Sequence, residues 1–177
     1  TRFSGVTGVQ TCALPISTES GLEAGARSAR YQALDSSAEK ENAVKIFLGH
    51  TRDDQAETVL LGLARGSGAR SLSGMAAENG KYLRPFLQVT RQETEEACKE
   101  LGLEIWNDPH NFNADFTRVK VRREILPLME SKLGPGISAA LARTAGLLRD
   151  DADALDGLAA AEISHLNLTD IDCEYLA

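Results

Sequence analysis

The sequence predicts an α/β fold in which a buried strand lies between helices. Residues 43–48 form a short, nearly continuous apolar run that only Lys45 interrupts, which is typical of a strand covered on both faces. Ala56, Val59, Leu60 and Leu63 then recur at helical spacing, so a helix begins where the strand ends. Polar side chains at that junction lie outside the carboxyl end of a sheet, where open α/β folds bind ligands.

The other elements follow from periodicity and capping signals. Thr51 with Asp54, and Thr90 with Glu93, each place an acid three residues after a threonine, as a capping box requires. Trp106 ends an apolar stretch, and we expect it in the core. In chain order we expect a helix over 19–40, a strand over 43–48, a helix over 53–65, a strand over 82–87, a helix from 90 to about 101, a short strand over 104–106, a helix over 115–132, a break at 134–136 and a long amphipathic helix over 137–163.

Four polar residues gather at the start of the helix over 53–65: His50, Asp53, Asp54 and Glu57. Asp53 and Glu57 lie four residues apart on a different stripe from the apolar positions, so we expect them to face a ligand. Taken singly, acids in a first turn serve the helix dipole, and a histidine that closes a strand is usually structural. The set exceeds what capping needs and would repel a bare phosphate. It therefore favours magnesium with a nucleotide, or the supply of a base.

Basic side chains crowd one later segment, at Arg118, Lys120, Arg122 and Arg123. Arg118 and Arg122 share a helical face, which predicts phosphate contacts. The alternative is a solvated helix face, and composition does not decide between them. The formal net charge of −7 argues against indiscriminate nucleic-acid binding but allows a local basic surface.

The residues at 50–58 read HTRDDQAET, and RGSG at 65–68 and LSGM at 72–75 follow them. This pattern closely resembles the tRNA(Ile)-lysidine synthetase family of PP-loop ATPases. RPFL at 84–87 and the run from DPHN at 108–111 to Leu126-Pro127 are also similar to family segments. The similarity extends from about residue 19 to about residue 160, which makes chance unlikely. Val119 departs from the family, where many members carry asparagine.

The resemblance implies a Rossmann-like doubly wound parallel sheet of PP-loop ATPase type, incomplete here and followed by a helical arm. Residues 18–133 would be a partial PP-loop ATPase domain, and residues 134–177 a long helix and the start of a linker to a further domain. The implied reaction is ATP-dependent ligation of L-lysine to C2 of the wobble cytidine of tRNA(Ile) with a CAU anticodon. It passes through an adenylated intermediate and releases AMP and diphosphate. ATP, Mg²⁺, free L-lysine and tRNA(Ile) are the implied cofactors and partners.

The resemblance also implies roles for individual residues. Those implied in catalysis are His50, Asp53, Asp54 and Glu57, with Mg²⁺ on Asp53 and Asp54. Those implied in the ATP-binding loop are Thr58, Arg65, Gly66, Ser67 and Gly68. Those implied in tRNA binding are Arg70, Arg84, Asn111, Arg118, Lys120, Arg122 and Arg123.

One family feature is missing from the sequence. PP-loop enzymes carry a Ser-Gly-Gly-x-Asp-Ser loop after their first strand, and this chain has no such motif. Residues 1–17 show no helical or strand period, and residues 9–16 look like translated sequencing-adapter sequence. We therefore expect residues 1–17 to be non-native, the alternative being a divergent strand. We also expect the chain as written to be unstable or aggregation-prone, and inactive in lysidine formation.

Composition allows one globular domain with an appendage: of the 177 residues, 42% are hydrophobic and 25% charged. No segment is long enough to cross a bilayer, so we expect no membrane partner. Cys12, Cys98 and Cys173 are widely spaced and fit reduced thiols in the cytoplasm. Three other functions stay open: another PP-loop tRNA-modifying or amidating enzyme, a metal-dependent phosphohydrolase, and a catalytically dead tRNA-binding fragment. The sequence leaves the oligomeric state unknown.

Overall fold

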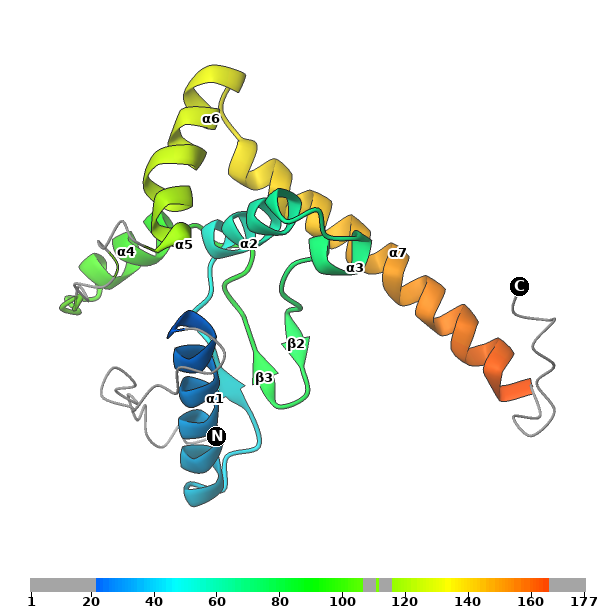
Figure 1. Cartoon of the computed structure of the whole chain (residues 1–177). Coiled ribbons are helices and arrows are strands. Elements are labelled where there is room, and N and C mark those ends of the chain that lie inside the picture. Colours follow the sequence, from blue (N-terminus) through cyan, green and yellow to red (C-terminus); the bar gives the residue numbers. More distant parts are fainter. Residues whose placement is uncertain (1–21, 107–110, 112–115, 166–177) are drawn as a thin grey trace. The chain divides into compact units, whose positions relative to one another are not determined.

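The computed structural model describes residues 22–106, 111 and 116–165. The chain divides into two compact units, whose elements are drawn in Figure 1. Unit 1 contains the chain up to Leu48 together with Glu78–Leu83. Unit 2 contains Gly49–Ala77 and the chain from Arg84 onward. The candidate site residues from His50 to Arg123 all belong to unit 2.

Unit 1 combines one described helix with a small mixed sheet. Its elements are α1 (Leu22–Lys40), β1 (Ile46–Phe47), β2 (Glu78–Asn79) and β3 (Tyr82–Leu83). The strand order is β1-β3-β2, with β1 parallel to β3 and β2 antiparallel to β3. The helix and the parallel pair confirm the expected α/β character. The antiparallel β2 was not predicted, and β1 and β3 are shorter than the strands expected over 43–48 and 82–87.

The strand over 43–48 is covered on one face only, which corrects the expectation of burial on both faces. Ile46 is buried, whereas Phe47 is 64% exposed and Val44 is 87% exposed. Ile46 lies opposite Tyr82 in the parallel register, and the Tyr82 ring contacts Tyr31 of α1 edge to face. Helix α1 therefore covers the face that carries Ile46. Because side chains alternate along a strand, Phe47 points to the other face, which no described helix of unit 1 covers.

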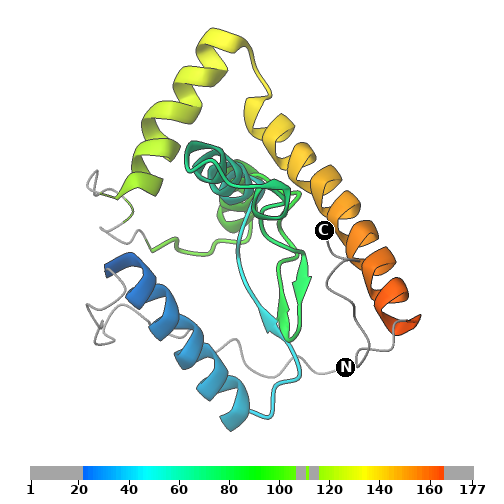
Figure 2. The ribbon, with the colours of Figure 1, turned by 45° about the vertical axis from the view of Figure 1, so that its right-hand side comes forward.

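Unit 2 is helical. Its elements are α2 (Arg52–Ala64), α3 (Ala69–Leu72), α4 (Arg91–Glu100), α5 (Thr117–Lys120), a π-helical turn η2 (Val121–Ile125), α6 (Leu126–Leu133) and α7 (Ile137–His165). In Figure 2, α2 lies in the angle between the α5–α6 segment and α7. The core of this angle is formed by Ala56, Val121 and Leu126. Its packing fixes the first turns of α2 against η2 and α6.

The local signals at the helix ends are confirmed. Asp54 accepts hydrogen bonds from the backbone N–H of Thr51 at 2.8 Å and from its hydroxyl at 2.9 Å, so the capping box starts α2. Thr90 and Glu93 form the second capping box at the start of α4. The break at 134–136 separates α6 from α7, with Gly134 and Gly136 at φ values of 104° and 99°. Within the described chain, no helix has both the length and the apolar character that a bilayer crossing demands.

Two expectations about residues 82–106 are wrong. The strand expected over 82–87 ends at Leu83, and Arg84 onward forms loop and turn. The strand expected over 104–106 is absent from the described sheet, and Trp106 is 67% exposed instead of lying in the core. Apolar composition was the only signal there, and none of the described strands pairs with this stretch. The start of the helix expected over 115–132 lies outside the described residues, and its remainder is the continuous α5, η2 and α6.

Candidate active site

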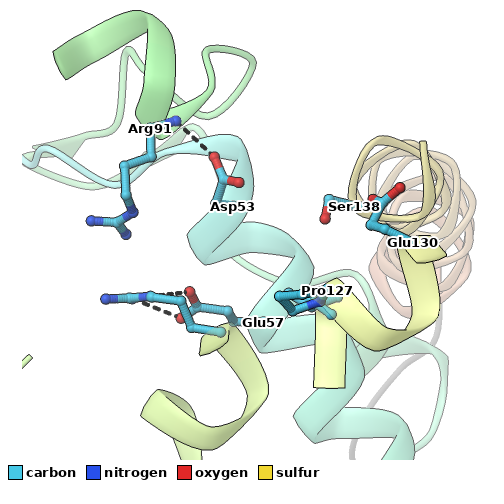
Figure 3. A pocket seen from close by; sticks show the side chains of 8 residues that line it. Asp53, Glu57, Arg91, Pro127, Glu130 and Ser138 are labelled. Carbon is cyan, nitrogen blue, oxygen red and sulfur yellow. Dashed lines mark hydrogen bonds and ion pairs between the residues drawn. The ribbon is translucent and has the colours of Figure 1, made fainter. Parts of the chain in front are cut away.

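A pocket of about 190 Å³ opens beside the first turns of α2, as Figure 3 shows. It is built by α2, α4, η2, α6 and the start of α7. The side chains that line it are Asp53, Glu57, Arg91, Arg122, Leu126, Pro127, Glu130 and Ser138. Two of the four residues implied in catalysis therefore line a common concave surface.

Asp53 is the cluster acid with an oxygen left for a ligand. It is half-buried, and its Oδ2 accepts the backbone N–H of Arg91 at 2.7 Å. This contact places the carboxylate at the N-terminus of α4, where the helix dipole favours negative charge. Among the described residues, Oδ1 of Asp53 has no recorded hydrogen bond or ion pair. Asp53 is thus held in position while one oxygen stays available.

Asp54 is, by contrast, fully engaged. Its Oδ2 takes the two hydrogen bonds from Thr51, and its Oδ1 lies 3.0 Å from Arg91 and 3.1 Å from Arg122. Burial alone would raise the pKa of the Asp54 carboxyl, but the Thr51 hydrogen bonds and the two guanidinium charges together hold that pKa below its usual value. Asp54 is therefore an ionised structural carboxylate that joins α2 to α4 and η2.

Glu57 lines the pocket, and its carboxylate is paired with arginines of the protein. Its side chain is 0% exposed, and Arg122 donates to both oxygens, at 2.5 and 2.9 Å. Arg118 Nε lies 3.7 Å from the second oxygen. The α5–η2 segment packs on this face of α2 and carries both arginines to it. Arg122 lies in the π-helical turn, a rare geometry that often occurs at functional sites.

The cluster is electrically balanced. Its members are three acids, Asp53, Asp54 and Glu57, and three arginines, Arg91, Arg118 and Arg122. A balanced cluster does not repel phosphate as three bare carboxylates would, so this argument for an intervening cation no longer applies.

The expected magnesium site on Asp53 and Asp54 does not fit this arrangement. Both oxygens of Asp54 are already used by Thr51 and the arginines. Among the residues that the structure describes, no group of three or more His, Cys, Asp or Glu side chains is placed to hold a metal ion. A hard cation such as Mg²⁺ needs open oxygen ligands, and only Asp53 has one.

His50 and Thr58 lie near the cluster without lining the pocket. His50 is half-buried in the connection that precedes the Thr51 cap. The Thr58 hydroxyl donates to the Asp54 carbonyl at 2.8 Å and accepts a hydrogen bond from Arg118 at 2.8 Å. Thr58 thus anchors the arginine-bearing segment to α2. This contact is structural, whereas the resemblance implied a contact with ATP.

The glycine-rich segment 65–68 lies at the opposite end of α2. At about 1.5 Å per residue, Arg65 is roughly 18 Å along the helix from Asp53. Gly66 has φ of 68° and donates its N–H to Leu63 at 3.0 Å, so it terminates the helix in the left-handed conformation. Arg65 and Gly68 are exposed, and Gly68 caps the four-residue α3. The structure does not bring this segment to the pocket.

The arginines implied in tRNA binding divide by burial and by partner. Arg70 forms exposed ion pairs with Asp153 at 2.5 Å and Asp156 at 2.6 Å. Arg84 is buried and donates to the Ala76 carbonyl at 2.9 Å. Arg118 and Arg122 do share a helical face, as predicted, but that face is turned toward α2. Four of the implied residues are exposed: Arg70, Asn111, Lys120 and Arg123.

Two charged pocket residues, Arg91 and Glu130, were missed by the sequence analysis, as was Ser138. Arg91 is the first residue of α4, and only its position after the Thr90 cap could have drawn attention to it. Glu130 accepts backbone N–H groups of Ser138 at 2.8 Å and Gly136 at 2.6 Å, and these bonds hold the pKa of Glu130 below its usual value. The available signal was the position of Glu130, an acid shortly before the start of α7, whose first backbone N–H groups need acceptors.

The small mixed sheet and the helices make this an α/β protein, and comparison identifies the family. The chain belongs to the PP-loop family, whose domain model matches residues 6–129. This confirms the family recognised from the sequence and the fold class, an incomplete α/β unit followed by a helical arm. The matched range includes part of the segment 1–17, whose non-native origin stays a prediction.

Three curated relatives are named tRNA(Ile)-lysidine synthase. The protein from Thermobifida fusca is 58% identical over 158 residues, which are 89% of this chain and 49% of the relative. The protein from Streptomyces coelicolor is 57% identical over 88% of this chain and 45% of the relative. The protein from Leifsonia xyli is 56% identical over 78% of this chain and 42% of the relative. The chain spans about half the length of these relatives.

A solved structure supports the fold. The U34-tRNA thiolase NcsA from Methanococcus maripaludis, determined with its [4Fe-4S] cluster, matches with a TM-score of 0.55 and 19% identity. The match covers 70% of this chain and 43% of the thiolase. At this identity the likeness concerns the fold alone.

Proposed function

We propose that this chain is part of a tRNA(Ile)-lysidine synthetase, an ATP-dependent carbon–nitrogen ligase. The reaction joins the ε-amino group of L-lysine to C2 of the wobble cytidine of tRNA(Ile) with a CAU anticodon and releases AMP and diphosphate. The observation that carries the proposal is the 58% identity over 158 residues to a relative of that name. ATP, when bound, supplies the adenyl group that activates C2. Because the reaction needs tRNA and ATP together, we place it in the cytoplasm.

The pocket supports an amine-using reaction. The open oxygen of Asp53 accepts an ammonium group, while Leu126 and Pro127 offer an apolar wall for a methylene chain. The balanced charge of the cluster lets a negatively charged phosphate approach as well. Asp54 and Glu57 act through their arginines: they orient Arg91 and Arg122 and do not touch the substrate.

The tRNA contacts are assigned to exposed groups. Lys120 and Arg123 lie on the solvent side of the α5–η2 segment, and Asn111 is exposed. Exposed cations contact backbone phosphates and position a nucleic acid without reading its sequence. Arg118 and Arg122 hold the segment that carries Lys120 and Arg123 against α2. Magnesium is proposed only as the companion of ATP, coordinated by its phosphates and not by an Asp53–Asp54 pair.

The test is transfer of labelled L-lysine to tRNA(Ile) bearing a CAU anticodon. We would build a chimera in which residues 18–160 replace the aligned segment of the Thermobifida fusca relative. ATP-dependent, tRNA-dependent incorporation at a rate within about tenfold of the parent is expected. A tRNA whose anticodon lacks the wobble cytidine is the control substrate. Incorporation into neither tRNA by a folded chimera would refute the proposal, as would equal incorporation into both.

A further inference from the structure

Arg91 links two acids of the cluster through different atoms. Its backbone N–H donates to Asp53 Oδ2 at 2.7 Å, and its guanidinium donates to Asp54 Oδ1 at 3.0 Å. A change of the side chain therefore leaves the Asp53 contact in place and removes only the Asp54 contact. Substituting Arg91 therefore changes the charge of the pocket while the backbone contact that positions Asp53 is kept.

The Arg91 guanidinium retains unused donor capacity. Arg122 donates to both Glu57 and Asp54, whereas the Arg91 side chain makes one hydrogen bond to the residues that the structure describes. Arg91 Nε is buried and has no hydrogen-bond partner within the described part of the chain. A ligand cannot reach this buried atom, but the Arg91 side chain as a whole is 39% exposed, and its charged guanidinium favours an acceptor supplied by a ligand at the accessible edge. Figure 3 shows this side chain reaching from α4 toward Glu57 along the pocket.

Arg91 is also the most solvent-accessible cation of the cluster. Its side chain is 39% exposed, compared with 24% for Arg122 and 30% for Arg118. Removing its charge leaves the three cluster carboxylates with two guanidinium groups, and Glu130 adds a further carboxylate to the pocket lining. The pocket would then attract cations more strongly and anions less strongly, because Coulomb energies are large at a partly buried site.

We propose that Arg91 is a specificity-determining residue of this pocket, which recognises the anionic group of a ligand and balances the acids so that anionic and cationic groups can bind together. The inference rests on the proposed function, because that reaction brings both a phosphate-bearing ligand and an amine to the pocket. It assigns the two charges to different residues: the anion to the Arg91 guanidinium, and the ammonium to the open oxygen of Asp53.

The test measures binding of inorganic pyrophosphate and of 1,5-diaminopentane to the 177-residue chain by titration calorimetry at low salt. Arg91→Gln should weaken pyrophosphate binding by about tenfold and tighten diamine binding by about threefold. Arg91→Lys restores the charge and should bring both affinities to within about threefold of the parent chain. Arg143→Gln removes an exposed arginine of α7 and should change neither affinity.

The opposite directions are the diagnostic result, because misfolding would weaken both ligands together. Joint weakening in Arg91→Gln would overturn the inference, and so would unchanged affinities or a parent chain that binds neither probe. If the two affinities shift in opposite directions but the chimera fails to ligate lysine, the role of Arg91 stands and the proposed function is rejected. If the chimera ligates lysine but Arg91→Gln leaves both affinities unchanged, the proposed function stands and the role of Arg91 is rejected.

Discussion

The two ends of α2 carry similar sequence signals and have different structures. The N-terminal end brings Asp53, Asp54 and Glu57 into contact with arginines from α4, α5 and η2. The C-terminal end runs into the segment 65–68, which is exposed except for the half-buried Ser67, and Arg70 beyond it pairs with two exposed acids of α7. The first end is a partly buried charge network around the fully buried Glu57, beside a pocket, and the second is a helix terminus with surface ion pairs.

The difference teaches that burial, more than residue type, decides what a charged cluster can do. A carboxylate–guanidinium pair removed from water must be matched in geometry, and losing one partner leaves an uncompensated charge. A pair in solvent is screened and contributes little. Charge substitutions at the two ends should therefore have unequal effects, which three experiments measure in order of decreasing size.

The largest effect is expected for Glu57→Gln. Glu57 is fully buried, and the change leaves Arg122, with 24% of its side chain exposed, without its bidentate partner. We expect the free energy of unfolding to fall by about 2–4 kcal/mol. Urea unfolding followed by helical circular dichroism measures the change. Glu124→Gln, an exposed acid of η2, is the matched control and should leave the urea midpoint nearly unchanged.

A double variant separates the ion pair from general damage. Glu57→Gln combined with Arg122→Met removes both charges, so it should lose less stability than the sum of the two single changes. Strict additivity would show that Glu57 and Arg122 are not coupled. The network at the N-terminal end of α2 would then be no different in kind from the surface pairs of Arg70.

An intermediate effect is expected for Asp54→Asn, and it should depend on pH. The pKa of Asp54 is lowered from its ordinary value of 3.8, so the ionised form stabilises the fold at every pH above that value. The contribution is then lost as the pH falls through the lower folded-state pKa. At pH 7 the variant should be less stable by about 2 kcal/mol, a typical value for hydrogen bonds to a charged group.

Urea midpoints at pH 7, 5, 4 and 3 test the sign of this linkage. The gap between the parent chain and Asp54→Asn should stay constant down to about pH 5 and narrow below pH 4. Asp151→Asn, which removes an exposed acid of α7, is the control for general charge effects. A gap that widens on acidification would contradict the assignment of Asp54 as an ionised, arginine-bound cap.

The helices were predictable because their signals are local. The Thr51–Asp54 and Thr90–Glu93 boxes and the break at 134–136 each depend on a few neighbouring residues, and each occurs as expected. The strands were predicted poorly because a strand depends on its partners. Antiparallel β2 has no apolar pattern of its own and exists through its pairing with β3. Trp106 lies on a stretch for which no described strand provides a partner.

The site was predictable as a location but not as a network. A cluster of acids after a strand pointed to the start of α2, and the pocket lies there. The pairing of Glu57 with Arg122 spans 65 residues of sequence, and no local rule tells which helix face will receive a distant arginine. The same limit explains Arg91, an unremarkable first residue of α4 until the fold sets it against Asp53 and Asp54.

The smallest effect is expected for Arg70→Gln, and it tests the other end of α2. Arg70, Asp153 and Asp156 have side chains 56%, 57% and 66% exposed, so water and salt screen their attraction despite the short contacts. The urea midpoint should therefore stay within experimental error of the parent value at physiological salt. Any small loss seen at low salt should disappear as the salt concentration rises, whereas the loss in Glu57→Gln should persist. If Arg70→Gln destabilised the chain as much as Glu57→Gln, burial would not be the property that distinguishes the two ends of α2.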